Sequence, residues 1–415
     1  MNQIPGPRSR ELAERLRKHE SRGVTFLSED FPIFWESAHD ALVTDVDGNE
    51  YIDLTSAFGV ATAGHTNPRV GDAIAAQSKQ LVHGLGDVHP SRMRVELLEK
   101  LASIAPGDLS VSYLCNSGSE AVDFALKTAF LRNKRPAVLA FTGGYHGLTS
   151  SALSVTGIDK FREPFAPFIR GDVRFAPFPT PLHTLEMEFR GYRTGTVIVE
   201  PIQGRAGVIV PPRGWLAGLR ALCDLYGATL IFDEIYTGFG RTGKMFALDY
   251  EDVVPDLLCV GKAIANGVPL AAVIGTRKAM DAWEASSGEA LHTSTYLGNP
   301  LACAAALANI KEIEERELVQ RAASLGAKLG ARLRDLPERT PLVSAIRGRG
   351  MLWGVQLPSP ELTFAVTKEA LRLGTIVLPS GVRGDVITLA PPVTIDEGQL
   401  MHAVDLLEQA IQKSA

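Results

Sequence analysis

Residues 229–262 read TLIFDEIYTGFGRTGKMFALDYEDVVPDLLCVGK, and they decide the fold. The apolar runs TLIFD and DLLCVG are short and continuous, which is typical of strands buried on both faces. The first run ends at Asp233-Glu234, and Lys262 directly follows the second. Because ligands of open α/β sheets bind outside the carboxyl ends of the strands, this stretch predicts a site as well as a sheet.

The same pattern continues outward in both directions. The apolar runs VSYLC, AVLAF, GTVIVE and LAAVIG alternate with helical patterns such as VGDAIAAQSKQL and SEAVDFALKTAFLRN. Strands separated by helices indicate βαβ units. We therefore expect an α/β protein whose large domain has a mostly parallel sheet flanked by helices.

The two ends of the chain differ from this central block. An Ala/Leu/Glu-rich region that follows it predicts one or two helices, and the remainder has the pattern of a small α+β lobe. Near the start, alternating residues around Asp47-Gly48 predict a hairpin. We expect the large domain at residues 65–300, the small domain at 301–415, and residues 1–64 packed with the small lobe.

Composition and charge exclude several classes of function. The chain has 415 residues, of which 45% are hydrophobic and 21% charged, as in a soluble globular protein. Its net charge of −5 gives no global positive field for nucleic acid or an anionic membrane. No run approaches the roughly 18 apolar residues of a membrane span, and the charged start of the chain has no apolar signal-peptide core. A cytoplasmic protein without nucleic-acid or membrane partners is expected.

The cysteines do not form a metal-binding or disulfide pattern. Cys115, Cys223, Cys259 and Cys303 are scattered, without CxxC pairs or histidines at metal-ligand spacing. We expect reduced core thiols and no bound metal.

Three segments can contact one ligand. The segment CNSGSEA, residues 115–121, follows a strand and begins a helix, where free backbone N–H groups and hydroxyls form an anion site. Asp233 ends a buried strand, and Lys262 lies among glycines and apolar residues. Burial among these residues would desolvate the Lys262 amine and lower its pKa. Each feature alone also has an ordinary explanation: a capping box, a solvent-facing acid, or a lysine that reaches out to solvent.

Together the three features favour one cofactor. An aldehyde cofactor with a phosphate and a pyridine nitrogen needs an anion site, a carboxylate at the ring nitrogen and a lysine amine. Tyr145, in GGYHGLTS, adds an aromatic ring that can stack on the pyridine. The combination predicts pyridoxal 5'-phosphate.

The motifs around these residues resemble those of one enzyme family. The stretches NSGSEA, YHG, EPIQG, DEIYTGFGRTGK, GKAIANGVPLAA, TSTYLGNPLACAAA, RGRGMLWGV and LAPPVTI run from about residue 45 to 392. They are similar to the class III aminotransferases, the ornithine, acetylornithine and ω-amino-acid transaminase group of the fold type I pyridoxal-phosphate enzymes. The stretch from Asp233 to Lys262, with FGRTGK between them, is long and highly specific.

The resemblance implies a role for each matching residue. The cofactor contacts that it implies are Gly118 and Ser119 (phosphate), Tyr145 and Ile235 (the two ring faces), Asp233 (ring nitrogen), Glu200 (hydrogen-bonding shell), Lys262 (Schiff base) and Thr295 (phosphate of the neighbouring subunit's cofactor). Because Thr295 would complete a neighbouring site, the resemblance also implies a homodimer or a higher assembly.

The resemblance implies a reaction as well. Lys262 would form an internal aldimine, be displaced by a donor amine and then move the α-proton as general base. An amine, ω-amino or amino-acid donor and a keto-acid or aldehyde acceptor would react in turn, in ping-pong fashion. Asp233 and Tyr145 would complete the catalytic set.

Several positions depart from the family pattern. Leu148 and Thr388 stand where arginines that clamp a substrate carboxylate are common. Arg205 replaces a common glutamate, and Tyr236 replaces a glutamine that often reaches the cofactor. Our hypothesis is that Arg205 supplies the contact for the acceptor anion, although a solvent-facing Arg205 fits the sequence equally well.

Other side chains lie next to these motifs. Phe58 and His65 are expected near the substrate entrance, where they can shape the pocket. His146 and His292 are expected to pack or to orient loops rather than to act as acids.

Three alternatives remain open. An aminomutase of the glutamate-1-semialdehyde type, or a decarboxylating member, would use the same cofactor shell. A nucleotide-binding Rossmann enzyme would need a GxGxxG turn directly after its first strand, and the run VSYLC is followed by NSGSEA instead. A non-catalytic binding protein on this fold would be expected to lose Lys262 or Asp233, and both are present.

Overall fold

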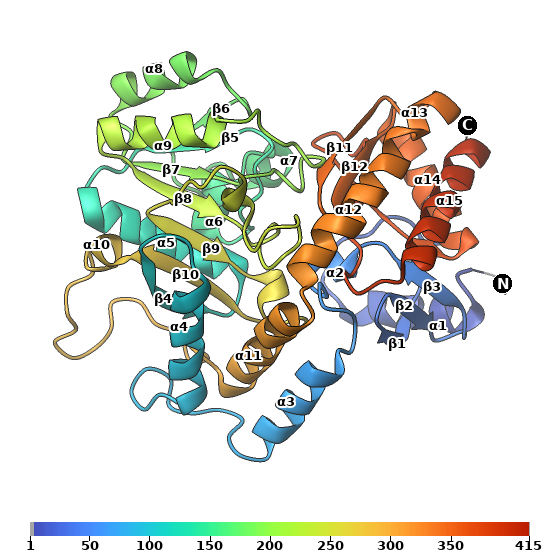
Figure 1. Ribbon diagram of the computed structural model, residues 1–415, viewed down its shortest axis with the longest axis horizontal. Coiled ribbons are helices and arrows are strands. Elements are labelled where there is room, and N and C mark those ends of the chain that lie inside the picture. The colour runs from blue at the N-terminus through green and yellow to red at the C-terminus, as the bar shows by residue number, and fades with distance from the viewer. Residues whose placement is uncertain (1–3, 415) are drawn as a thin grey trace.

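The computed structural model describes residues 4–414, which form two lobes (Figure 1). The larger lobe is built on a seven-stranded sheet with the order β4-β10-β9-β8-β7-β5-β6. Its strands are β4 (Leu109–Cys115), β5 (Val138–Phe141), β6 (Val173–Ala176), β7 (Thr196–Val199), β8 (Thr229–Asp233), β9 (Leu257–Val260) and β10 (Ala271–Thr276).

The sheet is mostly parallel, as predicted. Neighbouring strands are parallel from β6 through β5, β7 and β8 to β9, whereas β10 is antiparallel to both β4 and β9. An apolar strand has the same composition in either direction, so the sequence does not give the direction of β10. Strand β6 is not predicted from the sequence, because this edge strand has Arg174 in its centre and lacks a continuous apolar run.

Both faces of this sheet are buried, as the continuous apolar runs predict. In β8, Leu230 and Phe232 enter one hydrophobic core, and Ile231 enters another on the opposite face. Helix α9 (Trp215–Tyr226) contributes to the first core, and α5 (Gly118–Asn133) contributes to the second.

Further helices surround the sheet and connect the lobes. They are α3 (Pro68–Ser78), α4 (Arg92–Ile104), α6 (Ser150–Val155), α7 (Asp159–Arg162), α8 (Leu182–Tyr192), α10 (Arg277–Met280) and the 3-10 helices η1 (Glu163–Phe165), η2 (Ala247–Tyr250) and η3 (Lys262–Ile264). Helix α11 (Pro300–Glu315) packs against α3 and α4 and is followed by α12 (Leu318–Arg334), which leads into the smaller lobe (Figure 1).

The smaller lobe combines segments from both ends of the chain. Its antiparallel sheet has the order β11-β12-β15-β14, with β11 (Ala345–Arg349), β12 (Leu352–Gln356), β14 (Leu378–Ser380) and β15 (Val386–Leu389). The remaining helices are α13 (Leu336–Arg339), α14 (Pro360–Leu373) and α15 (Glu397–Lys413).

A second four-stranded sheet joins the N-terminal segment to this lobe. It has the order β1-β2-β3-β13, with β1 (Trp35–His39), β2 (Leu42–Asp45), β3 (Glu50–Asp53) and β13 (Thr375–Ile376). The hairpin predicted around Asp47-Gly48 is β2–β3, and β3 pairs in parallel with β13. The N-terminal elements, including α1 (Pro7–His19) and α2 (Ser56–Gly59), therefore lie beside the C-terminal ones (Figure 1).

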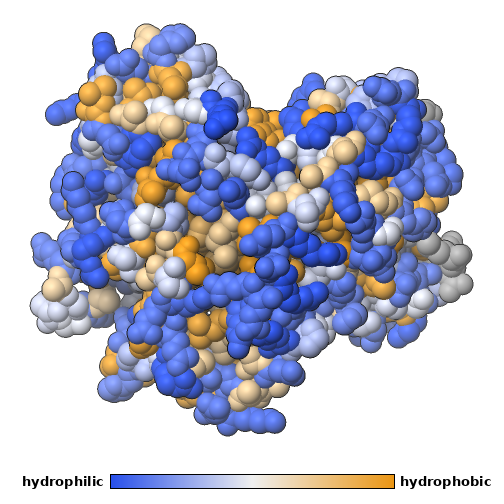
Figure 2. Space-filling model, viewed as in Figure 1, coloured by the Kyte–Doolittle hydropathy of each residue, from blue (hydrophilic) through white to orange (hydrophobic). Residues whose placement is uncertain are grey.

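Figure 2 shows a mainly hydrophilic face that is notched between the two lobes, with hydrophobic residues at the base of the notch. Within residues 4–414, every helix falls short of the length and apolar character that a membrane span needs. Cys115, Cys223, Cys259 and Cys303 are all free and buried, as expected.

Candidate functional site

A cavity of about 710 Å³ opens at the carboxyl ends of the central strands. Both lobes line it: the large lobe contributes the residues after β4, β5, β7, β8 and β9, and the small lobe contributes Leu378, Pro379, Ser380 and Thr388. Nearly all of the cofactor contacts predicted from the sequence line this one cavity: Gly118, Ser119, Tyr145, Glu200, Asp233, Ile235 and Lys262. Thr295 does not line it.

Asp233 is a buried carboxylate that is held from two sides. It ends β8 and is 4% exposed. Its Oδ2 lies 2.7 Å from Nδ1 of the buried His146, and its Oδ1 accepts from the Ile235 backbone N–H at 3.1 Å. Because a carboxylate only accepts, Nδ1 of His146 carries the proton in this pair.

Lys262 begins η3 directly after β9, with a φ of 42°. Its Nζ lies 4.9 Å from the ring centroid of Tyr236. Burial lowers the pKa of this amine, and the charges of Asp233 and Glu200 oppose the shift. Lys262 is therefore biased toward the neutral form that can act as nucleophile and base.

The predicted anion site is the first turn of α5. Ser117 Oγ accepts from the Glu120 N–H at 3.3 Å, and Glu120 Oε2 accepts from the Asn116 N–H at 2.8 Å. Ser117 therefore caps the helix, whereas Glu120 bonds the residue before the cap, so the reciprocal capping box is incomplete. Helix geometry still leaves the first N–H groups, those of Gly118 and Ser119, without an intrahelical acceptor. A side chain at Gly118 would bring its Cβ within 2.8 Å of Ile235 Cδ1, so this turn closes directly on the side chain beside Asp233.

Glu200 fixes the loop that carries Tyr145. Its Oε1 accepts from the Tyr145 N–H at 2.9 Å, and its Oε2 accepts from the Gly204 N–H at 3.0 Å. Burial raises the pKa of Glu200 to about 7. The Tyr145 ring meets Phe161 edge-on, with 5.8 Å between the ring centroids, so both rings form one wall of the cavity.

The residues that depart from the family pattern also line the cavity. Arg205 is half-buried and donates from Nη1 to the Pro379 carbonyl at 3.0 Å. Leu148 is exposed, whereas Thr388 is buried and bonded to Ser380. Arg205 is thus a cation on the cavity wall, where two uncharged side chains replace arginines.

Tyr236 is clamped between two glycines. A Cβ at Gly59 would lie 2.1 Å from Cε2 of the ring, and a Cβ at Gly204 would lie 2.2 Å from Cδ1. The ring therefore fits only between residues without side chains, with Lys262 close to its face.

Phe58 lines the cavity from an unusual turn. Ser56, Ala57 and Phe58 all have left-handed backbone angles, with φ of 47°, 49° and 65°. This conformation costs an L-residue about 1–2 kcal/mol relative to the right-handed one. A turn strained in this way persists only where its surroundings hold it.

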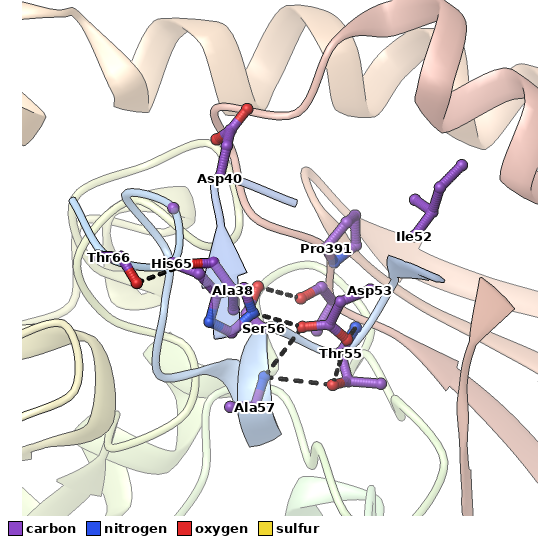
Figure 3. A network of polar contacts seen from close by, with 12 residues as sticks. Ala38, Asp40, Ile52, Asp53, Thr55, Ser56, Ala57, His65, Thr66 and Pro391 are labelled. Carbon is purple, nitrogen blue, oxygen red and sulfur yellow. Dashed lines mark hydrogen bonds and ion pairs between the residues drawn. The ribbon is translucent and has the colours of Figure 1, made fainter. Parts of the chain in front are cut away.

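Two histidines lie away from the cavity lining. His65 does not stand at the entrance as expected: it is 9% exposed and its Nε2 lies 2.7 Å from Asp53 Oδ2 (Figure 3). The imidazole instead makes a buried contact with the residue that ends β3. His292 packs against the rings of Tyr113 and Phe124, as expected.

The contacts of two buried residues, His146 and Arg241, are not predicted from the sequence. His146 is predicted only to pack or orient a loop, and its pairing with Asp233 is not predicted. Arg241 is fully buried and donates from Nη2 to Ser56 Oγ at 3.1 Å and to Thr62 Oγ1 at 2.9 Å. Burial lowers the pKa of Arg241 to about 10. The FGRTGK motif contains Arg241, but nothing local in it indicates a partner so far away in the sequence.

The residues of the cavity fit pyridoxal phosphate. The helix start suits a phosphate, the anchored carboxylate of Asp233 suits a protonated ring nitrogen, and the buried amine of Lys262 suits an aldehyde. A Cβ at Gly118 would fill space between the anion site and Ile235, which only glycine leaves open.

Comparisons with known proteins agree with this chemistry. The family model described as aminotransferase class-III matches residues 26–411. The chain is 37% identical to a 4-aminobutyrate aminotransferase of Mycobacterium leprae, over 99% of this chain and 97% of that protein. It is 39% identical to an acetylornithine aminotransferase of Methanopyrus kandleri, over 92% and 95%.

Solved structures have the same fold. A transaminase from the marine bacterium Virgibacillus superposes with a TM-score of 0.92 at 28% identity, covering 97% of this chain and 99% of that one. The ornithine aminotransferase of Toxoplasma gondii gives a TM-score of 0.90 at 28% identity, covering 98% and 95%. The chain therefore belongs to the class III aminotransferases, pyridoxal-phosphate-dependent transaminases of fold type I.

Proposed function

We propose that this transaminase moves an amino group from an amine, ω-amino or amino-acid donor to a keto-acid or aldehyde acceptor, with Lys262 as the residue that holds the cofactor and carries the proton. The observation that carries the proposal is the shared cavity: the buried Lys262 amine, the anchored Asp233 carboxylate and the first turn of α5 all line it. In this role the bound cofactor supplies an electron sink for the substrate α-carbon.

Different residues of the cavity would transfer the proton, keep the ring nitrogen protonated and bind the cofactor. Lys262, biased toward its neutral form by burial, would remove the substrate α-proton as general base and then, as general acid, deliver it to the cofactor carbon that takes up the amino group. Asp233, oriented by His146, keeps the ring nitrogen protonated. Tyr145 and Ile235 hold the ring between them, and the amides of Gly118 and Ser119 bind the phosphate.

The residues on the substrate side of the cavity are consistent with an anionic acceptor that is bound by Arg205. Leu148 and Thr388 offer no positive charge to a substrate carboxylate. Arg205, which is half-buried in the cavity lining, does offer one. A guanidinium with one nitrogen bonded to Pro379 keeps other N–H groups for a carboxylate. Because Leu148 and Thr388 stand where arginines would bind a substrate carboxylate, we expect a donor without an α-carboxylate, such as a simple amine or an ω-amino acid.

A homodimer is part of the proposal, and an exposed apolar surface supports it. Two segments form this surface, residues 81–88 and 291–296. Their exposed hydrophobic side chains are Leu81, Val82, Leu85, Val88, Leu291 and Tyr296. Thr293 Oγ1 donates to Asp87 Oδ2 at 2.8 Å, and the His83 and Tyr296 rings lie 5.2 Å apart, so the two segments make one face. The exposed Thr295 lies within this face, where it would reach the cofactor phosphate of a second copy.

The test is the half-reaction with one substrate at a time. Purified enzyme loaded with cofactor is mixed with a panel of lysine, ornithine, β-alanine, simple amines and amino sugars. A transaminase loses its visible absorbance band with the right donor and regains it only when a keto acid is added. An aminomutase would turn over without any acceptor, and a binding protein would keep its band with every donor.

A further inference from the structure

A buried carboxylate lies behind the turn that carries Phe58. Asp53, at the end of β3, is fully buried. Its Oδ1 accepts from the N–H and the Oγ1 of Thr55, at 2.7 and 2.6 Å. Its Oδ2 accepts from the Ala57 N–H at 3.3 Å and from His65 Nε2 at 2.7 Å. Figure 3 shows His65, Thr55 and Ala57 converging on this one side chain.

His65 is a fixed donor in this group. Its backbone N–H donates to the Asp40 carbonyl at 2.8 Å, and its carbonyl accepts from the Asp40 N–H at 3.0 Å. The Trp35 ring meets its imidazole edge-on, with 5.5 Å between centroids. Because Asp53 can only accept, Nε2 of His65 carries the proton that faces it. His65 therefore holds the Asp53 carboxylate in one orientation.

The carboxylate in turn holds a strained turn. Ser56, Ala57 and Phe58 are three consecutive non-glycine residues with left-handed backbone angles. Asp53 bonds the backbone N–H groups of Thr55 and Ala57, which flank the first strained residue. An orientation of Asp53 that lost these two contacts would remove support from the segment that most needs it.

The turn lines the cavity and also contacts Tyr236, whose ring lies beside Lys262. Phe58, 65% exposed, lines the cavity, and Gly59 closes on the edge of the Tyr236 ring. Lys262 Nζ lies 4.9 Å from the centroid of that ring. Asp53 and His65 are not among the residues that line the cavity, but Asp53 bonds Thr55, which does line it, and Ala57 in the turn.

We propose that the Asp53–His65 pair is a positioning device for the substrate cavity: by holding the turn from Ser56 to Gly59, it fixes Phe58 against the donor and Tyr236 beside Lys262. The inference rests on the proposed function, because it concerns where the substrates of that reaction sit. Asp53 and His65 are positioning residues and touch no substrate.

The first experiment compares His65→Asn with His65→Gln in the holoenzyme. A glutamine places its amide nitrogen near the position of Nε2, whereas asparagine is one methylene shorter and falls short of Asp53. His65→Asn should raise the donor KM about tenfold and change kcat less, since a displaced wall misplaces the bound substrate. His65→Gln should restore KM to near the wild-type value. Thr66→Ala, which removes a hydrogen bond to the Ala38 carbonyl at the same corner, is the control and should leave KM unchanged.

The second experiment asks whether the effect passes through the turn. In a Phe58→Ala background, His65→Asn should change KM less than it does in the wild type, because one of the two side chains that the turn positions is gone. Ala57→Gly removes the Cβ that opposes the left-handed angle, so it should rescue part of the defect of His65→Asn. Additive effects, or a lowered Tm with unchanged KM for His65→Asn, would overturn the proposal.

The third measurement needs no turnover. Amide hydrogen exchange of residues 55–59 in the cofactor-loaded protein should be faster in His65→Asn than in wild type or His65→Gln. If the wild type accepts no donor while this exchange pattern holds, the proposed function fails and the role of the pair in holding the turn stands. If the wild type is active and His65→Asn changes neither exchange nor KM, the positioning role is wrong.

Discussion

His146 Nδ1 lies 2.7 Å from Asp233 Oδ2, with both side chains buried, so the carboxylate proposed to contact the cofactor ring has a partner behind it. The two residues come from different parts of the sheet edge: Asp233 ends β8, and His146 lies in the loop after β5. The pair therefore couples the orientation of the acid to the loop that carries Tyr145.

Removal of this partner should weaken cofactor binding. A hydrogen bond to a charged group contributes about 1.5–3 kcal/mol, so His146→Leu should raise the dissociation constant of pyridoxal phosphate at least about tenfold. His146→Asn, whose amide nitrogen lies close to the position of Nδ1, should keep most of the affinity. Fluorescence titration of the apoprotein measures both values. Equal affinities for wild type and His146→Leu would show that Asp233 needs no such anchor.

Lys262 should be required for both the absorbance band and the chemistry. Lys262→Ala should bind the cofactor without the visible band of a lysine-bound form, and transamination should fall by about 10²–10⁴-fold for the loss of general base catalysis alone. Lys278→Ala, at an exposed lysine of α10, is the matched control. A visible band that survives in Lys262→Ala, and disappears in the control, would assign the linkage to another lysine.

The sequence predicts those parts of the site that chain order and strand ends determine. Asp233 and Lys262 each follow a continuous apolar run, and the carboxyl ends of parallel strands meet at one edge. The anion site is predicted for the same reason, because a helix must begin where the strand before Gly118 ends. These inferences need only local patterns and one general property of α/β sheets.

Contacts between distant segments are beyond such patterns. Arg241 bonds Ser56, and the Gly59 and Gly204 backbones clamp Tyr236, although each pair is far apart in the sequence. The position of His65 is predicted wrongly, because the local sequence around a histidine is the same whether its ring faces a cavity or a buried carboxylate. Here the ring faces Asp53. Only the packing of β3 against this loop decides between the two.

The unfolding free energy of the apoprotein should fall as pH rises. Burial raises the pKa of Glu234 from 4.5 to about 7, against the opposing hydrogen bonds from the Ala247 and Leu248 N–H groups. The folded state then binds more protons than the unfolded state between these values, so stability is full below the unfolded pKa and is lost as pH rises through the folded one. At about 1.4 kcal/mol per pKa unit, the change is on the order of 3 kcal/mol for this group.

Urea unfolding at about pH 5 and about pH 8 measures the difference. Glu234→Gln cannot titrate, so the difference between the two pH values should shrink, even though the variant is less stable at both. Glu200, whose pKa burial raises in the same direction, should contribute in parallel. A difference that is unchanged in Glu234→Gln would mean that Glu234 is ionised throughout this range.

Arg205 should determine acceptor binding. If its guanidinium meets the acceptor carboxylate, Arg205→Ala should raise the acceptor KM by about 10-fold or more, because a hydrogen bond to a charged partner is lost. Steady-state kinetics with pyruvate or 2-oxoglutarate as the acceptor measure this change. Arg205→Lys keeps the charge but not the planar fork, so an intermediate value is expected. Arg213→Ala, at an exposed position further along the same connection, should have no effect. Unchanged acceptor KM in Arg205→Ala would leave this arginine with its Pro379 contact alone.

The apolar face formed by residues 81–88 and 291–296 should hold two copies together. Leu85 and Val88 are 60% and 66% exposed, so lysines at both positions should keep the fold and block association by burying charge at the interface. Light scattering should give about twice the 44.6 kDa chain mass for wild type and about one chain mass for the double variant.

Activity should follow association, because Thr295 would complete the phosphate site of a second copy. Loss of the dimer should therefore weaken cofactor binding, and Thr295→Ala should weaken it without loss of the dimer. Leu225→Lys, at an equally exposed leucine on α9, is the control for added charge and should remain dimeric and active. A wild-type protein that is monomeric and fully active would refute the dimer and the role of Thr295 together. A dimer in which Thr295→Ala binds cofactor normally would refute only the second, since the apolar face alone can hold two copies together.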